Sequence, residues 1–235
     1  APFYLRRTKE ALVTFPDPVN GKCKKLFTDR NVQTIEFQID DEEFDFYDEL
    51  TRYVDEQSAK ASTDVSPRGR AVGFIMAMLQ RRFASSIYAV RKSLERMRDK
   101  REKILKDPEA YCRSQINKRL PDDFEEYTEE EQQEIITQLE STVLTVDPTA
   151  LKEDIQAISR LINHAKTLEK REVESKLTKL KEVLNKQGIF DDPKMKLLLF
   201  TEHKETLDFL VEKLKSWGLT VTQIHGGMKI GSLNE

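Results

Sequence analysis

The chain has 235 residues, of which 34% are charged and 38% hydrophobic, and its formal net charge is −3. This length is sufficient for a buried core in one large domain or two small ones. The slightly negative total excludes a chain that binds nucleic acid as a uniform polycation. No apolar run approaches the ~20 residues that cross a bilayer, and the first residues lack a signal-peptide layout. We therefore expect a cytoplasmic protein with no membrane partner.

Residues 1–65 are predicted to contain a short strand followed by one helix. The strand is indicated by apolar residues at alternate positions, Ile35, Phe37 and Ile39. The helix is expected to open on the acidic run from Asp40 to Glu43, because negative charge suits the N-terminal end of the helix dipole. The small, polar residues 59–66 indicate a loop after it.

Residues 66–106 are predicted as helices with a break and N-cap at Ser85-Ser86. They carry 12 Lys and Arg against 3 Asp and Glu, a net charge of +9, whereas residues 107–150 carry a net charge of −9. The basic face either binds a DNA backbone, releasing counterions, or it pairs with the acidic stretch or is simply solvated. The adjacent opposite charges favour the second interpretation for most residues. Four basic residues near the break are our DNA-binding candidates: Arg81, Arg82, Arg91 and Lys92.

A further helix is predicted to begin at Asp147-Pro148, since proline is favoured in a first helical turn. Its apolar residues step by four and three positions, and they form the seam Leu151, Ile155, Ile158, Ile162 and Ala165. The seam resumes toward Leu184 and is too short for a long coiled coil, so we expect a helical hairpin or bundle. Gly188 is predicted to end the last helix of this region.

Residues 191–235 have the pattern of one βαβ unit. The continuous apolar run 197–200 is typical of a strand that is buried on both faces. A helix follows it, Gly218 is expected to end that helix, and residues 219–224 are predicted as a second strand. The loop after the second strand contains Gly226 and Gly227.

Three blocks of the sequence resemble one family, the Swi/Snf-type DNA-dependent ATPases of helicase superfamily two. Residues 3–9 (Phe-Tyr-Leu-Arg-Arg-Thr-Lys) resemble the block that leaves the first motor lobe of that family. Residues 196–203 (Lys-Leu-Leu-Leu-Phe-Thr-Glu-His) resemble the first strand and turn of the second lobe, and residues 224–228 resemble the block that closes the next strand. The closest likeness is to bacterial and archaeal Swi/Snf-like helicases.

The resemblance implies an internal piece of a DNA translocase or helicase with a mainly α fold and a small α/β part. Residues 1–65 would link the lobes, 66–190 would form a charged helical insertion domain, and 191–235 would begin an incomplete RecA-like second lobe. DNA would be the partner of the parent motor, and the insertion would offer a surface to a protein partner. A sheet that stops after two strands has an open edge, so we also expect edge pairing or a dimer.

The resemblance also assigns roles to particular residues. Thr201, His203, Gly226 and Gly227 would contact DNA phosphates and sugars, because they lie in loops that follow the two strands. Arg6, Arg7, Thr8 and Lys9 would form a brace between the lobes. Two other classes stay open: a helical protein-interaction module without DNA binding, and a small nucleotide-binding α/β protein.

No phosphate-binding loop of the form G-x-x-x-x-G-K-[ST] occurs in the sequence, and no metal-spaced cysteine pair is present. We therefore expect no catalytic residue, no cofactor and no metal in this chain, with ATP and Mg²⁺ bound elsewhere in the parent protein. The isolated chain is expected to hydrolyse no ATP with or without DNA, as measured by phosphate release. A DNA-stimulated turnover that stays with the chain through purification would contradict this expectation.

Overall fold

The computed structural model describes Val19, Gly21, residues 32–114, 120–171 and 174–226, and Met228. The chain divides into two compact units, Ala1–Glu36 and Phe37–Glu235. In the first unit, the described residues contain neither helix nor strand. The second unit is built from helices, and the prediction of a mainly α chain is confirmed.

The helices of the second unit are, in chain order, α2 (Asp41–Ser62), α3 (Pro67–Ser85), α4 (Ile87–Lys106), α5 (Pro108–Ser114), the 3₁₀ turn η1 (Phe124–Glu126), α6 (Glu129–Leu139), α7 (Pro148–Arg171), α8 (Ser175–Lys186) and α9 (Lys204–Ser216). α2 extends four residues into the predicted loop 59–66. α2 also packs in the same core as α3, so the helical body begins before residue 66.

Local side-chain chemistry sets the starts of three helices. The Asp40 carboxylate accepts a hydrogen bond from the N–H of Glu42, and the Ser66 hydroxyl accepts one from Arg68. Ser86 ends α3 and caps α4, its hydroxyl accepting from the N–H of Ala89 at 3.1 Å. Each cap satisfies a backbone donor that has no partner within the helix. The predicted break at Ser85-Ser86 is therefore confirmed.

Glycine has a conformational role at the end of α8 and a steric role at the start of α3. Gly188 has φ +71°, and the N–H of Ile189 donates to the carbonyl of Leu184, which is the Schellman ending that the sequence predicts. At Gly69, a Cβ would overlap the carbonyl oxygen of Asp64. A residue without a side chain is therefore required where α3 starts against the end of α2.

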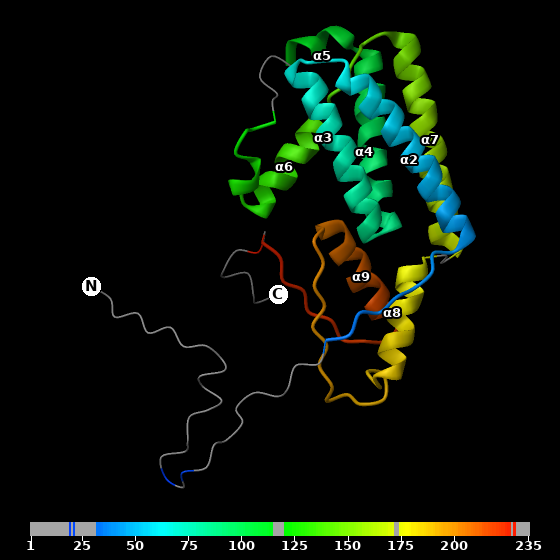
Figure 1. Cartoon of the computed structure of the whole chain (residues 1–235), viewed down its shortest axis with the longest axis vertical. Coiled ribbons are helices and arrows are strands. Elements are labelled where there is room, and N and C mark those ends of the chain that lie inside the picture. Colours follow the sequence, from blue (N-terminus) through cyan, green and yellow to red (C-terminus); the bar gives the residue numbers. More distant parts are fainter. Residues whose placement is uncertain are drawn as a thin grey trace. The chain divides into compact units, whose positions relative to one another are not determined.

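Four long helices enclose the main core. α2 contacts α3, α3 contacts α4, α4 contacts α7, and α7 returns to α2, so the four form a closed ring (Figure 1). Their fully buried side chains include Phe46, Leu50, Leu79, Leu94 and Ile162. The predicted seam of α7 supplies Ile158, Ile162 and Ala165 to this core. Burial of each large aliphatic or aromatic side chain in this core contributes about 1.5–3 kcal/mol to folding.

A charged cluster is buried at one side of this core. The guanidinium of Arg82 on α3 lies 2.9 Å from the Glu140 carboxylate, which follows α6, and the two side chains are 2% and 1% exposed. The other carboxylate oxygen of Glu140 lies 2.8 Å from Nε of Arg96 on α4. Ser93 and Gln133 accept further hydrogen bonds from Arg82. Acidic and basic stretches of the sequence thus meet, largely through one glutamate.

A second buried polar cluster, of three side chains, joins α2, α4 and α7. The hydroxyl of Tyr53 donates to the Asp154 carboxylate at 2.9 Å, and the buried guanidinium of Arg101 pairs with the other oxygen of that carboxylate. Burial raises the pKa of Tyr53, which therefore stays protonated and remains a donor. Each of the three helices supplies one member of this cluster.

The strands predicted from the sequence are not present in the described part of the chain. Residues 32–39, 197–200 and 219–224 contain no strand, and no strand pairing is present in the described part of the chain. Leu198 and Phe200 are 76% and 87% exposed, although the apolar run 197–200 predicts burial on both faces. A buried strand needs neighbouring strands for its backbone hydrogen bonds and covering helices for its faces. The described residues supply no paired strand to this segment, and the neighbouring helices α8 and α9 leave Leu198 and Phe200 exposed.

Replacing Glu140 by alanine is expected to lower the free energy of unfolding by about 3–5 kcal/mol, because Arg82 would keep its burial and lose its main charge partner. The measurement is urea unfolding followed by circular dichroism. Asp48→Ala is the control: it breaks the exposed Arg52–Asp48 pair of α2 and is expected to cost less than about 1 kcal/mol. Equal losses for the two variants would contradict the prediction.

Candidate nucleic-acid interface

The corner between α3 and α4 is the place where the C-terminal part of the chain meets the helical body. The hydroxyl of Thr206, in the first turn of α9, lies 2.8 Å from the Ser85 hydroxyl and 3.0 Å from the Ser86 hydroxyl. From α8, the Lys176 amine donates to the carbonyl of Ala84 at 2.9 Å. Polar groups from α8 and α9 thus converge on the last residues of α3.

Two further contacts fix α9 against α4. The rings of Tyr88 and Phe209 are stacked, with centroids 5.3 Å apart and an interplanar angle of 18°. Arg96 lies 3.2 Å from the Glu205 carboxylate while it also pairs with Glu140. Glu205 is therefore tied to the buried charged cluster. Together these contacts hold the N-terminal turn of α9 beside the C-terminal end of α3.

This arrangement brings together predicted site residues that are far apart in the sequence. Arg81 is near the end of α3, and its Nη2 atom lies 2.6 Å from the Glu202 carboxylate. The side chains of Arg81 and Glu202 are 60% and 61% exposed. Glu202 stands between Thr201 and His203, two of the predicted DNA contacts. An exposed guanidinium, a hydroxyl and an imidazole therefore gather where the helix dipole of α9 is positive.

The environment of His203 keeps its imidazole neutral at physiological pH. Burial lowers the pKa of His203, and the positive charges of Arg82 and Arg81 act in the same direction, while Glu202 and Glu205 oppose them. Its Nε2 is buried and has no hydrogen-bond partner among the described residues. In this fold the Nε2 atom of His203 is therefore not open to an external phosphate, and the neutral imidazole adds no positive charge.

The remaining basic candidates fall into two groups. Arg82 is buried against Glu140, and Arg91 is largely buried between Glu95 and Glu169, so neither guanidinium is open to a phosphate in this fold. This placement argues against both as DNA contacts. Lys92 is 39% exposed, with its amine 3.8 Å from Glu95 and 5.5 Å from the centre of the Tyr88 ring.

The remaining predicted site residues, the two glycines and the basic block near the N-terminus, have no described contact with the turn from Thr201 to His203. Gly226 is exposed in a turn that is closed by a 3.1 Å hydrogen bond from the N–H of Met228 to the carbonyl of His225. Within the described part of the chain, no hydrogen bond joins Gly226 to Thr201 or Arg81. Gly227 and the block Arg6, Arg7, Thr8 and Lys9 lie outside the described residues.

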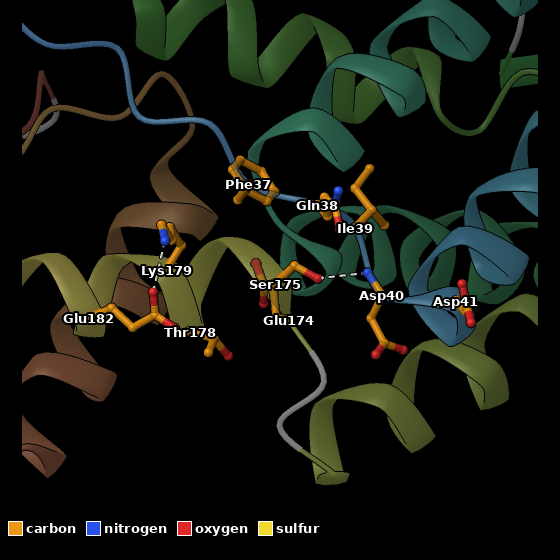
Figure 2. Close-up of a pocket in the computed structure, with 10 residues that line it drawn as sticks. All are labelled: Phe37, Gln38, Ile39, Asp40, Asp41, Glu174, Ser175, Thr178, Lys179 and Glu182. Atoms are coloured by element: carbon orange, nitrogen blue, oxygen red, sulfur yellow. Dashed lines mark hydrogen bonds and ion pairs between the residues drawn. The ribbon is translucent and has the colours of Figure 1, made fainter.

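Two cavities flank α8. The larger, of about 540 Å³, lies between the N-termini of α2 and α8, where the Ser175 hydroxyl accepts a 2.9 Å hydrogen bond from the N–H of Asp40 (Figure 2). The smaller, of about 210 Å³, lies between α8, α9 and the Ser85-Ser86 corner, and Phe200 and Thr201 also line it. Glu174 lines both cavities.

Glu174 has the most perturbed acidity in this region. Burial raises the pKa of Glu174 to about 8, and the negative charges of Glu43 and Glu169 act in the same direction, while Lys176 and Lys213 oppose them. Glu43 is also buried, and its carboxylate accepts a 2.9 Å hydrogen bond from the N–H of Ser175. The Glu174 carboxyl is therefore largely protonated at neutral pH in the folded chain.

Glu202, Thr206 and Glu140 are not among the site residues predicted from the sequence. Thr206 gives a detectable signal, because it stands three and four positions before Phe209 and Leu210 and so lies on the apolar face of α9. A polar residue at such a position indicates a buried hydrogen bond. Glu202 and Glu140 give no comparable signal, since each is one acid among several.

Comparison with known proteins finds no matching protein-family model, no similar curated protein and no similar solved structure. Among the described residues, no group of three or more His, Cys, Asp or Glu side chains is arranged to hold a metal ion. No helix within the described ranges is both long enough and apolar enough to cross a membrane.

Replacing Glu174 by glutamine is expected to stabilise the fold increasingly as the pH rises. The folded-state pKa of about 8 exceeds the ordinary value of 4.5, so the folded chain keeps a proton that the unfolded chain releases. The stability that Glu174 contributes is present below pH 4.5 and is lost as the pH rises to 8. The amide avoids that loss, which is on the order of 1.4 kcal/mol per pKa unit.

The measurement is urea unfolding of both proteins at pH 5 and pH 8. Glu182→Gln, which alters an exposed carboxylate at the same cavity, is the matched control and is expected to show no such divergence. A constant difference between Glu174→Gln and the natural chain across this range would contradict the prediction.

Proposed function

We propose that the chain is part of an ATP-dependent DNA translocase or helicase of the Swi/Snf type. Its role there is to couple the motor lobes and to contact the nucleic-acid backbone. Catalysis, with ATP and Mg²⁺, belongs to other parts of the parent protein. The resemblance of residues 3–9, 196–203 and 224–228 to that family is the starting point of the proposal.

The observation that carries the proposal is the position of Arg81 beside the turn from Thr201 to His203. The resemblance alone predicts that this turn faces a DNA backbone. The 2.6 Å Arg81–Glu202 contact adds an exposed guanidinium at the same place, from a helix 121 residues away in sequence. Guanidinium groups, hydroxyls and helix N-termini are the groups that bind phosphates in protein–DNA complexes.

The exposed apolar segment before α9 supports the assignment of residues 191–235 to the start of a RecA-like lobe. The apolar segment 197–200, the helix α9 and the segment 219–224 follow one another in the order of the predicted βαβ unit. In the second segment, residues 219, 221 and 223 are half-buried and residues 220, 222 and 224 are exposed, as in a strand with one covered face. Further strands of a lobe would cover Leu198 and Phe200.

A helical protein-interaction module without DNA binding is the second candidate. It is favoured by the burial of Arg82 and Arg91 in ion pairs, which removes two basic groups from the surface. Such a module would bind its partner through the helices of residues 107–187. The dependence of DNA binding on salt separates the two candidates, because only phosphate contacts release counterions.

Arg81→Ala is expected to weaken DNA binding to a similar extent for unrelated DNA sequences. It should also reduce the slope of log affinity against log salt by about 1, the value for one lost phosphate contact. Fluorescence anisotropy of labelled duplex and single-stranded oligonucleotides, titrated at several salt concentrations, measures both effects.

Arg52→Ala is the matched control, since Arg52 is also an exposed arginine that pairs with a carboxylate, but it lies on α2 and not at this turn. It should leave the slope unchanged. Salt-independent binding, or the absence of binding by the natural chain, would favour the interaction module. Equal effects of the two variants would place the DNA contact elsewhere.

A further inference from the structure

The guanidinium of Arg81 pairs with the Glu202 carboxylate at the turn where the proposed function places a DNA phosphate. Its guanidinium contacts Oε1 of Glu202 at 2.6 Å, and Glu202 lies in the turn between Thr201 and His203. Carboxylates and phosphates offer arginine the same chemistry, a negatively charged oxygen that accepts its N–H groups. The two ligands therefore compete for one guanidinium.

The energetics allow this exchange at Arg81 and forbid it at Arg82. Exposed ion pairs contribute about 0–1 kcal/mol, and both members of the Arg81–Glu202 pair are about 60% exposed. A phosphate is thus able to replace the carboxylate at small cost. Arg82 and Glu140 are 2% and 1% exposed, and separating them would leave two buried charges without each other.

We propose that Glu202 is an intramolecular competitor of nucleic-acid phosphate for Arg81, and that this contact lowers the affinity of the α3–α9 junction for DNA. The proposal rests on the proposed function, because the competing ligand is the phosphate of a bound nucleic acid. DNA binding would then require the Glu202 side chain to swing away from Arg81. The freed guanidinium and the Thr201 hydroxyl face the backbone together.

The test is DNA binding by the whole chain and by Glu202→Gln, Arg81→Ala and the double variant, measured by anisotropy with a labelled duplex and its single strand. Glu202→Gln is expected to tighten binding about two- to fivefold, the range that corresponds to the strength of an exposed ion pair. In the Arg81→Ala background the same substitution should have no further effect, since the two residues act through one contact.

Asp48→Asn controls for the loss of one negative charge, because Asp48 is the carboxylate of the other exposed pair, Arg52–Asp48. It should change the affinity less than Glu202→Gln does. Thermal unfolding of each variant verifies that the fold is retained, which the exposure of both pairs leads us to expect. A larger effect of Glu202→Gln that depends on Arg81 supports the competition, even where the natural chain binds weakly.

Two results would overturn the proposed competition between Glu202 and phosphate for Arg81. If Glu202→Gln tightens binding equally with and without Arg81, or no more than Asp48→Asn does, Glu202 acts only as a distant charge. The proposed function then survives provided that Arg81→Ala weakens binding. If neither the natural chain nor Glu202→Gln binds either oligonucleotide at low salt, both the competition and the proposed function fail.

Discussion

The pairing of Arg82 with Glu140 is the constraint on which the helical body and its junction with α9 depend. Removing two charges from water costs several kcal/mol each, and this cost is offset only when nearly every donor and acceptor is satisfied. Glu140 pairs with Arg82 and Arg96, and Ser93 and Gln133 accept two further hydrogen bonds from Arg82. These contacts tie α3 and α4 to the end of α6.

The burial of Arg82 also determines the direction in which the Arg81 side chain points. Neighbouring residues of an α-helix point about 100° apart, so a helix that buries Arg82 turns Arg81 away from the same core. Arg81 then reaches Glu202 at the surface. Arg96 extends the influence of the pair further, because it joins Glu140 to Glu205 in the first turn of α9. The body and the C-terminal segment are thus coupled through charge as well as through Thr206.

Local features were predictable from the sequence, and long-range ones were not. The helix start in the acidic run from Asp40 to Glu43, the cap at Ser86 and the ending at Gly188 depend on neighbouring residues alone, and the structure has all three. Arg81 and Arg82 are adjacent and chemically identical, and only Glu140, 58 residues beyond Arg82, separates their roles. Similarly, the apolar pattern of 197–200 predicts a buried strand, but the described residues contain no strand there and Leu198 and Phe200 are exposed, because strand pairing and burial depend on neighbours outside the segment.

The contrast between the two ion pairs favours the α3–α9 corner as the proposed phosphate-binding surface. A ligand replaces an existing contact only where that contact is weak, and the Arg81–Glu202 pair is weak because water screens both side chains. Three other contacts hold the surrounding helices in place during such an exchange. They are the buried Arg82–Glu140 pair, the hydrogen bonds of Thr206 and the stacked rings of Tyr88 and Phe209. An exchangeable charge on a rigid support would let the proposed phosphate contact form without refolding the helices that present it.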